Sequence, residues 1–209
     1  ISLDRKNGQD LGAARSKLAE ITAATPAHAE AWFELALAER DLGVRADKPE
    51  ERAAHFAASK AALDRVLTLK PGHVRANVLK ADYLTRELAE ARDSDPARWR
   101  DARAFLLKAN EGDPDDPTVM YAWFESFLRQ GRAPTQVAHD GLARAFALQP
   151  EVPELRIRYA LDLAAQGQID KAITVLQVMA SNPHVGKQVE ETLKQLEARR
   201  AGASAPAAS

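Results

Sequence analysis

The stretch AHDGLARAFALQP at residues 138–150 decides the fold, because its pattern recurs along the chain. Its small residue Ala138 is followed four positions later by Leu142, then by Ala145, and Pro150 closes the stretch. Four other stretches keep this order at nearly the same spacing: Ala14/Leu18/Ile21/Pro26, Ser59/Leu63/Val66/Pro71, Ala102/Leu106/Ala109/Pro114 and Ala172/Leu176/Met179/Pro183. A recurrence every few tens of residues is typical of stacked repeat proteins.

Each of the five stretches is predicted to be an α-helix that ends before its proline. Their apolar residues recur three and four positions apart, which places them on one stripe of a helix. Proline lacks a backbone N–H and disfavours helical geometry in the preceding residue, so the chain must turn there. No segment alternates polar and apolar residues as a half-buried strand would. The sequence therefore predicts an all-α protein made of antiparallel helix pairs.

The helix before each stretch has a weaker pattern, which in one repeat is Trp32-x2-Leu35-Ala36-x2-Glu39. The chain thereby resembles tetratricopeptide repeats, whose first helix carries Trp-x2-Leu-Gly-x2-Tyr and whose second carries Ala-x3-Phe and a proline. Leu replaces the second-helix aromatic in every copy, and Phe124 is bulky where the family has a small residue. The resemblance implies a right-handed superhelical array of antiparallel helix pairs, an α-solenoid. Later first helices contain Asn77, Lys80, Ala81 and Leu84; Met120, Trp123, Phe124 and Phe127; and Arg156, Tyr159, Ala160 and Leu163.

The spacing of the prolines predicts one solenoid over residues 1–200, with about four to five repeats and a C-terminal capping helix. The early pairs exceed the roughly 34 residues of an undecorated repeat. We expect a long turn and an extended second helix around Gly43–Glu50, and longer helices on both sides of the turn within 86–98, at Asp93-Ser94-Asp95-Pro96. The expected helix pairs are 1–26 (truncated), 27–71, 72–114, 115–150 and 151–183, followed by a cap at 185–200 and a disordered tail at 201–209.

Several residues predict how individual helices begin and end. Gly131 and Gly167 are expected to close the first helices of the last two pairs. Asp115 or Asp116 is expected to cap the helix that follows Pro114. The chain lacks an initiating Met, and family first-helix positions fall on its opening residues, so we expect a fragment of a longer protein. The capping helix is expected from an apolar stripe of Val185, Val189, Leu193 and Leu196.

Composition excludes several classes of partner and site. The formal net charge of −1 provides no global basic field for nucleic acid or anionic lipid. The absence of cysteine excludes disulfides and thiolate metal sites. No apolar run approaches the roughly 18 residues of a membrane span, and no signal peptide is visible. The alanine-rich, cysteine-free composition favours a soluble bacterial protein. It does not distinguish a cytoplasmic from a periplasmic location.

No catalytic, cofactor or metal motif is present, so we predict that the chain is not an enzyme and binds no cofactor or metal. Phosphate-loop, dinucleotide, zinc-protease and nucleophile-elbow patterns are all missing. His139-Asp140 is expected on a solvated helix face rather than as an oriented general base. Asp113-Pro114-Asp115-Asp116-Pro117 lacks the alternating ligands of a calcium loop and is expected to be a turn. Trp99, between Arg98 and Arg100, is expected to pack in its repeat rather than stack on a base.

The inner wall of the array is the expected binding surface. In tetratricopeptide arrays the first helices line a concave groove, and the resemblance implies that residues beside their packing positions face it. This wall suits an amphipathic helix or extended peptide anchored on Phe33, Val78, Tyr121 and Ile157. The Lys and Asn clamp of chaperone-binding relatives is missing here. The predicted wall residues are Phe33, Leu37, Arg40, Val78, Asp82, Arg86, Tyr121, Glu125, Arg129, Ile157, Arg158 and Leu161.

Two functional classes remain open from the sequence. The first is a non-catalytic scaffold that binds a protein or peptide in the groove. The second is a regulatory or substrate-positioning region of a larger bacterial enzyme whose catalytic domain precedes Ile1. The stretch Ser181-Asn182-Pro183-His184-Val185-Gly186 is similar to multidomain bacterial proteins with peptidase-like domains ahead of such repeats. The apolar wall is equally compatible with self-association or with packing against a missing N-terminal part.

Overall fold

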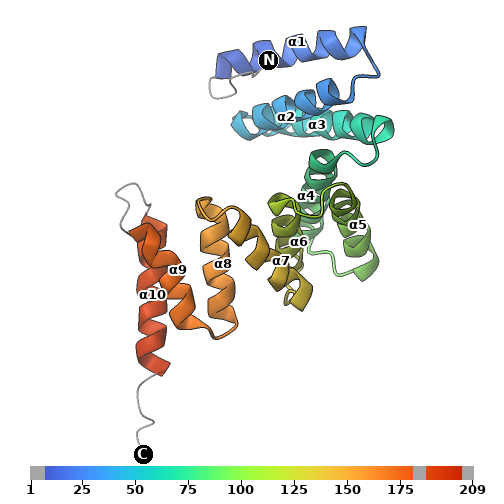
Figure 1. Ribbon diagram of the computed structural model, residues 1–209. Helices are drawn as coiled ribbons and strands as arrows, with labels where there is room; N and C mark the ends of the chain where they lie inside the picture. The colour runs from blue at the N-terminus through green and yellow to red at the C-terminus, as the bar shows by residue number, and fades with distance from the viewer. Residues whose placement is uncertain (1–7, 181–186, 204–209) are drawn as a thin grey trace, which may run out of the picture. The chain divides into compact units, whose positions relative to one another are not determined.

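A computed structural model describes residues 8–180 and 187–203, which form ten α-helices and no strand. The predicted all-α fold class is therefore confirmed for these residues (Figure 1). Pro183, Val185 and the start of the predicted truncated helix lie outside the described residues. The helices are α1 (Gly8–Ala24), α2 (Ala29–Arg45), α3 (Pro49–Leu69), α4 (Val74–Glu90), α5 (Pro96–Gly112), α6 (Pro117–Arg129), α7 (Gln136–Leu148), α8 (Pro153–Ala165), α9 (Ile169–Ala180) and α10 (Lys187–Ala203).

The chain divides into two compact units, Ile1–Pro114 and Asp115–Ser209, here called unit 1 and unit 2. Unit 1 contains α1 to α5, and unit 2 contains α6 to α10. Within each unit a helix packs mainly against its neighbours in the chain, as the successive colours of Figure 1 show. The division falls at one of the predicted repeat boundaries, whereas the superhelical arrangement of the whole chain stays a prediction.

The core of unit 1 joins three successive helices rather than isolated pairs. Leu63 and Val66 of α3 are fully buried between the apolar faces of α2 and α4. Leu11 and Leu18 attach α1 to α2 through a second cluster. Trp99 of α5 packs with Leu88 of α4, and its exposed fraction is 1%. The prediction that Trp99 packs within its repeat is confirmed.

The core of unit 2 repeats this arrangement, and α6 to α9 are shorter than the helices of unit 1. Leu142 of α7 is fully buried between α6 and α8, and Leu176 of α9 is fully buried between α8 and α10. Val189, Leu193 and Leu196 of α10 pack on α8 and α9, so this part of the predicted capping stripe is confirmed. The helix continues to Ala203, and the predicted boundary between cap and tail at residue 200 is therefore wrong.

Local turn chemistry follows the sequence signals closely. The carboxylates of Asp95 and Asp116 accept backbone N–H groups in the first turns of α5 and α6, and a proline follows each of them. Gly131 and Gly167 close α6 and α8 with φ values of 69° and 80°, a left-handed conformation that favours glycine. His28 and His73 cap α2 and α4, each accepting a backbone N–H through Nδ1.

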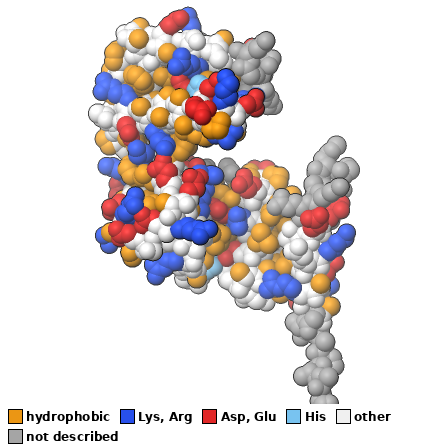
Figure 2. Space-filling view, turned by 180° about the vertical axis from the view of Figure 1, so that it is seen from behind, with side chains coloured by type: hydrophobic (Ala, Val, Ile, Leu, Met, Phe, Trp, Pro, Cys, Tyr) orange, Lys and Arg blue, Asp and Glu red, His pale blue; other side chains and the backbone are white. Residues whose placement is uncertain are grey.

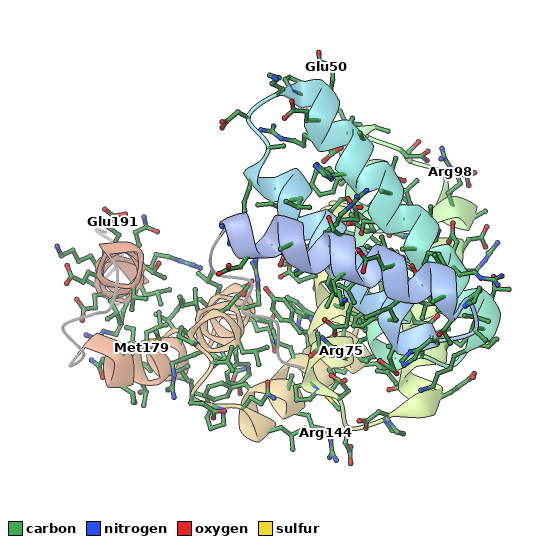
Figure 3. The ribbon with its side chains drawn as sticks, turned by 90° about the horizontal axis from the view of Figure 1, so that it is seen from above. Glu50, Arg75, Arg98, Arg144, Met179 and Glu191 are labelled. Atoms are coloured by element: carbon green, nitrogen blue, oxygen red, sulfur yellow. The ribbon has the colours of Figure 1, made fainter. Side chains whose placement is uncertain are left out.

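The connection between α2 and α3 differs from the prediction. We expected a long turn around Gly43–Glu50, but α2 continues through Arg45 and α3 begins at Pro49. Pro49 occupies the first turn of α3, where its missing N–H costs no helical hydrogen bond. The surplus residues therefore lie in α3, which has 21 residues and extends to a tip marked by Glu50 (Figure 3). The expected lengthening of the second helix is confirmed.

The prediction for His139 is also corrected. His139 does not lie on a solvated helix face, because its Nδ1 is 2.9 Å from the buried carboxylate of Asp162 on α8. Gln166 donates to the same carboxylate at 2.8 Å. A buried carboxylate needs such partners, because its desolvation is costly without them. The partner of His139 is thus an acid 23 residues away, and not its neighbour Asp140.

Candidate functional site

Unit 1 contains a cleft formed by α2, α3 and α4, here called the α2–α4 cleft. Its volume is about 670 Å³. The C-terminal half of α2 forms one side, the C-terminal half of α4 forms the other, and the middle of α3 contributes Phe56 and Lys60. The lining residues are Arg40, Asp41, Val44, Arg45, Phe56, Lys60, Asp82, Tyr83, Arg86, Glu87 and Glu90.

Two aromatic rings form the apolar part of the cleft. Phe56 and Tyr83 meet edge to face, with ring centroids 6.1 Å apart. Phe56 also lies against α2 at Gly43, where an added Cβ would be only 3.3 Å from the ring. The missing side chain at Gly43 therefore allows α2 and α3 to approach closely. Val44 lies beside these rings in the lining and is 67% exposed, so an apolar surface faces solvent there.

A buried hydrogen-bond chain holds Tyr83 in place. Its hydroxyl donates to Ser59 Oγ at 2.9 Å, and Ser59 donates to the carbonyl oxygen of Ala36 at 2.7 Å. This chain links α4, α3 and α2. Burial raises the pKa of the Tyr83 hydroxyl above its ordinary value of 10.0, although the hydrogen bond with Ser59 opposes this effect. Tyr83 is consequently a neutral, fixed part of the cleft at physiological pH.

The rim of the cleft consists of charged side chains of both signs. Arg40 pairs with Asp41 at 2.9 Å, and Arg86 pairs with Asp82 one helical turn away at 3.0 Å. Lys60 of α3 pairs with Glu87 of α4, and its Nζ lies 5.6 Å from the centre of the Tyr83 ring. Figure 2 shows basic and acidic side chains interspersed with apolar ones over unit 1. The rim therefore favours a ligand with mixed polarity over a polyanion or a polycation.

The structure separates the predicted wall residues of unit 1 into two groups. Arg40, Asp82 and Arg86 line the α2–α4 cleft, whereas Val78 is half-buried and lies outside its lining. Phe33 and Leu37 are only 1% and 5% exposed and belong to the core. They cannot act as anchors in this structure, so their assignment to the groove is corrected.

The burial of Phe33 has a specific cause. Its ring lies 4.8 Å from the ring of His73, centroid to centroid, and the Arg75 guanidinium covers it at 4.6 Å. Both residues come from the start of α4, where Arg75 is labelled in Figure 3. The next helix pair thus covers this position of the wall, as ridge-into-groove packing of successive helices allows.

In unit 2 predicted wall residues of α6 contact side chains of α8. The Tyr121 hydroxyl of α6 donates to Glu154 Oε1 of α8 at 3.1 Å. Glu125 of α6 lies 2.5 Å from Arg158 Nε of α8, and the exposed fractions of their side chains are 12% and 32%. Burial raises the pKa of Tyr121 to about 12, and the nearby carboxylates of Glu125 and Glu154 add to this effect.

The other wall residues of unit 2 are more varied. Ile157 is half-buried and packs with the core of α8, α9 and α10. Arg129 is half-buried, whereas Leu161 is 39% exposed. Only part of the predicted apolar row in unit 2 is therefore accessible to a ligand.

Sequence analysis missed the part of the cleft that comes from the second helix of the pair. Phe56 and Lys60 belong to α3, whereas the family pattern assigns the wall to first helices only. Val44 and Glu87 were missed as well, although they lie on first helices. The long interval between Pro26 and Pro71 indicated an extended α3, but it did not mark Phe56 or Lys60 as residues of the cleft.

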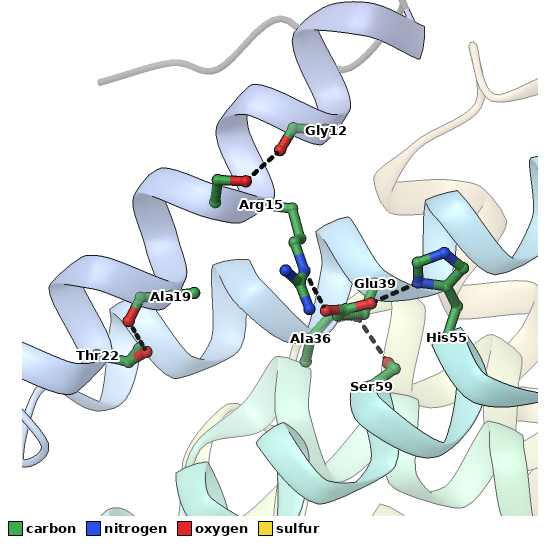
Figure 4. A network of polar contacts seen from close by, with 9 residues as sticks. Gly12, Arg15, Ala19, Thr22, Ala36, Glu39, His55 and Ser59 are labelled. Carbon is green, nitrogen blue, oxygen red and sulfur yellow. Dashed lines mark hydrogen bonds and ion pairs between the residues drawn. The ribbon is translucent and has the colours of Figure 1, made fainter. Parts of the chain in front are cut away.

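Unit 1 also contains a buried acid that belongs to the scaffold. Glu39 of α2 is 3% exposed, and its carboxylate lies 2.7 Å from Arg15 of α1 and 2.7 Å from His55 of α3 (Figure 4). Both oxygen atoms of the carboxylate are thereby paired. The contacts tie three helices together immediately beside the α2–α4 cleft, since His55 precedes the lining residue Phe56.

The described residues offer no arrangement for metal chemistry. Among them, no group of three or more His, Cys, Asp or Glu side chains is placed to hold a metal ion. In the same part of the chain, no helix combines the length and the apolar character needed to cross a bilayer.

Comparisons with known proteins identify no relative. No protein-family model matches the sequence, and the search of curated proteins finds no significant match. The residues and the geometry of the α2–α4 cleft are therefore the basis for inferring a function.

Proposed function

We propose that this chain is a non-catalytic protein-interaction scaffold of the tetratricopeptide type, which binds a peptide or partner helix in the α2–α4 cleft. The observation that supports this most directly is the meeting of three predicted wall residues, Arg40, Asp82 and Arg86, around one cleft. Its volume of about 670 Å³ lies within the range of roughly 300–1,000 Å³ that is usual for ligand sites.

The chemistry of the cleft favours a polypeptide ligand. Phe56, Tyr83 and Val44 supply apolar contact area, which can accept the apolar side chains of an amphipathic helix. The surrounding ion pairs can exchange partners with charged residues on the polar side of the same ligand. Side chains from three helices hold this surface in place, so binding needs little reorganisation of the protein.

The test uses two exposed valines that are closely matched. Val44 in the cleft is 67% exposed, and Val178 on α9 in unit 2 is 65% exposed. A library of displayed peptides is selected on the purified chain, and the enriched peptides are then measured against Val44→Glu and Val178→Glu. We expect Val44→Glu to weaken binding about tenfold or more, which corresponds to about 1.4 kcal/mol. Val178→Glu is expected to bind as the wild type does.

Two results would contradict the proposal. One is the failure of the wild-type chain to enrich any peptide. The other is equal binding of the enriched peptides to wild type and Val44→Glu. Circular dichroism of both variants checks that the helices are intact, which is expected because exposed substitutions usually change stability by about 0.5 kcal/mol or less.

A further inference from the structure

A second recess lies on the other side of α4 in unit 1. It is a groove of about 210 Å³ between α4 and α5, here called the α4–α5 groove. Its apolar walls come from Leu84 and Leu88 of α4 and from Phe105 of α5. This volume is below the usual range for sites that take a whole small molecule, and it suits a single apolar side chain. The complete lining is Leu84, Glu87, Leu88, Arg98, Asp101, Ala102 and Phe105.

The two recesses share one residue, Glu87. At 100° per residue, the α4 residues of the cleft and those of the groove occupy neighbouring sectors of the helix, with Glu87 at the border between them. The side chain of Glu87 is 48% exposed and can contact a ligand that crosses α4. The α2–α4 cleft and the α4–α5 groove are therefore two subsites on either side of one carboxylate.

The charges around this border are unequally paired. The lining cations Arg40, Lys60, Arg86 and Arg98 each form an ion pair with an acid in unit 1, and Arg45 also has an interaction partner. By contrast, Glu90 of the cleft and Asp101 of the groove have no ion pair within the described residues. Glu90 and Asp101, one in each recess, therefore offer carboxylates with which a basic side chain of a ligand can pair, while Glu87 pairs with Lys60.

We infer that the ligand is a segment with two apolar anchors and a basic residue between them. One anchor contacts Phe56 in the cleft, the other contacts Leu84 and Phe105 in the groove, and the basic side chain pairs with Glu90 or Asp101 near the shared residue Glu87. A helix brings residues three or four positions apart onto one face, so an amphipathic helix can present all three groups together. This inference rests on the proposed function and specifies the chemistry of its partner.

The first experiment examines the groove with a matched pair on α5. Phe105 lines the groove and is half-buried, whereas Leu107 is 53% exposed and lies outside both recesses. The probes are the peptides selected on the wild-type chain. We expect Phe105→Ala to weaken their binding about fivefold or more and Leu107→Ala to leave it unchanged. Equal binding to Phe105→Ala and wild type would overturn the inference.

The second experiment reverses charge at exposed positions, where folding is not at risk. Peptides selected on the wild-type chain are expected to be enriched in Lys or Arg between two apolar positions. Glu90→Lys combined with Asp101→Lys should weaken those peptides about fivefold and strengthen versions carrying Glu in place of the basic residue. Glu111→Lys, an equally exposed change on α5 outside both recesses, is the control and should have neither effect.

The outcomes separate the inference from the proposed function. If Val44→Glu abolishes binding while Phe105→Ala and the charge reversal do not, the cleft binds a ligand and the two-anchor model is wrong. Enrichment of peptides without a basic residue would also contradict the model. If Val44→Glu has no effect, the proposed function itself fails.

Discussion

Units 1 and 2 differ in how their predicted wall residues pair. In unit 1, Arg40 and Arg86 pair with carboxylates on their own helices. In unit 2, Tyr121 and Glu125 of α6 instead contact Glu154 and Arg158 on α8. In the α2–α4 cleft, however, Lys60 and Glu87 also pair across α3 and α4, so pairs between helices occur in both units. The packing of the helices, and not the repeat pattern alone, therefore decides which partner a wall residue takes.

Helix length is the second difference between the units. The second helix of the α2–α3 pair has 21 residues, whereas α7 has 13. At 1.5 Å per residue, α3 is about 12 Å longer than α7. The buried residues of α3 begin at Ser59, and the half-buried Phe56 just before them packs against the core of unit 1 and lines the cleft. The additional length of α3 thus lies mainly in its exposed first part, residues 49–54.

The variant with the largest expected effect tests whether the two units unfold independently of each other. Trp99→Ala removes a fully buried ring whose Nε1 donates to the carbonyl of Asp93 at 2.8 Å. We expect a loss of about 3–5 kcal/mol in the free energy of unfolding of unit 1. Hydrogen exchange should accelerate in α4 and α5 and remain slow in α8 and α9. Uniform acceleration over both units would show that they unfold as one body.

A smaller effect is expected from the buried acid next to the cleft. Glu39→Ala removes the carboxylate that joins α1, α2 and α3, and leaves the partly exposed Arg15 and His55 to water (Figure 4). We expect a loss of about 1–3 kcal/mol, measured by urea unfolding. Glu39→Gln keeps an acceptor of the same shape and should lose less. A loss below about 0.5 kcal/mol for Glu39→Ala would contradict the structural role of this contact.

The start of unit 2 offers a matched pair of aspartates. Asp116 caps α6 by accepting the backbone N–H of Thr118 at 2.7 Å, whereas Asp115 pairs with Arg144 on the surface. Asp116→Ala should therefore cost about 1 kcal/mol of stability. Asp115→Ala should cost clearly less, because exposed ion pairs contribute little. Thermal unfolding of both variants measures the difference. Equal losses of stability would show that the Asp116 cap does not stabilise unit 2.

The smallest effect at neutral pH comes from Tyr121, and it grows in alkali. Because its pKa is about 12 in the folded chain against 10.0 ordinarily, the folded state holds this proton more tightly than the unfolded state. The free energy of unfolding should therefore fall as pH rises from about 10 to 12. Tyr121→Phe should reduce this fall, measured by urea unfolding at several pH values. Identical pH profiles, or a Tyr121 midpoint near 10 in absorbance titration, would contradict the burial of the Tyr121 hydroxyl beside Glu125 and Glu154.

Sequence reasoning was most successful where the relevant interactions are local. Asp116 and Gly131 act within one turn of a helix end, so the residue types alone predicted the stop at Gly131 and narrowed the cap to Asp115 or Asp116. It failed for Phe33, because the residues that cover this ring come from the start of α4. It failed for His139 for the same reason, since the partner Asp162 lies on another helix.

The sequence by itself determined the helical class, the order of helices along unit 1 and unit 2, and most of their ends. Prolines, caps and apolar periodicity act over a few residues, so they can be recognised from the sequence alone. Only the tertiary structure decided which wall residues are open. The place of Arg40 in the cleft depends on the packing of α2, α3 and α4, and Tyr121 contacts Glu154, which lies 33 residues away in the sequence. Such partners meet only after the helices have packed.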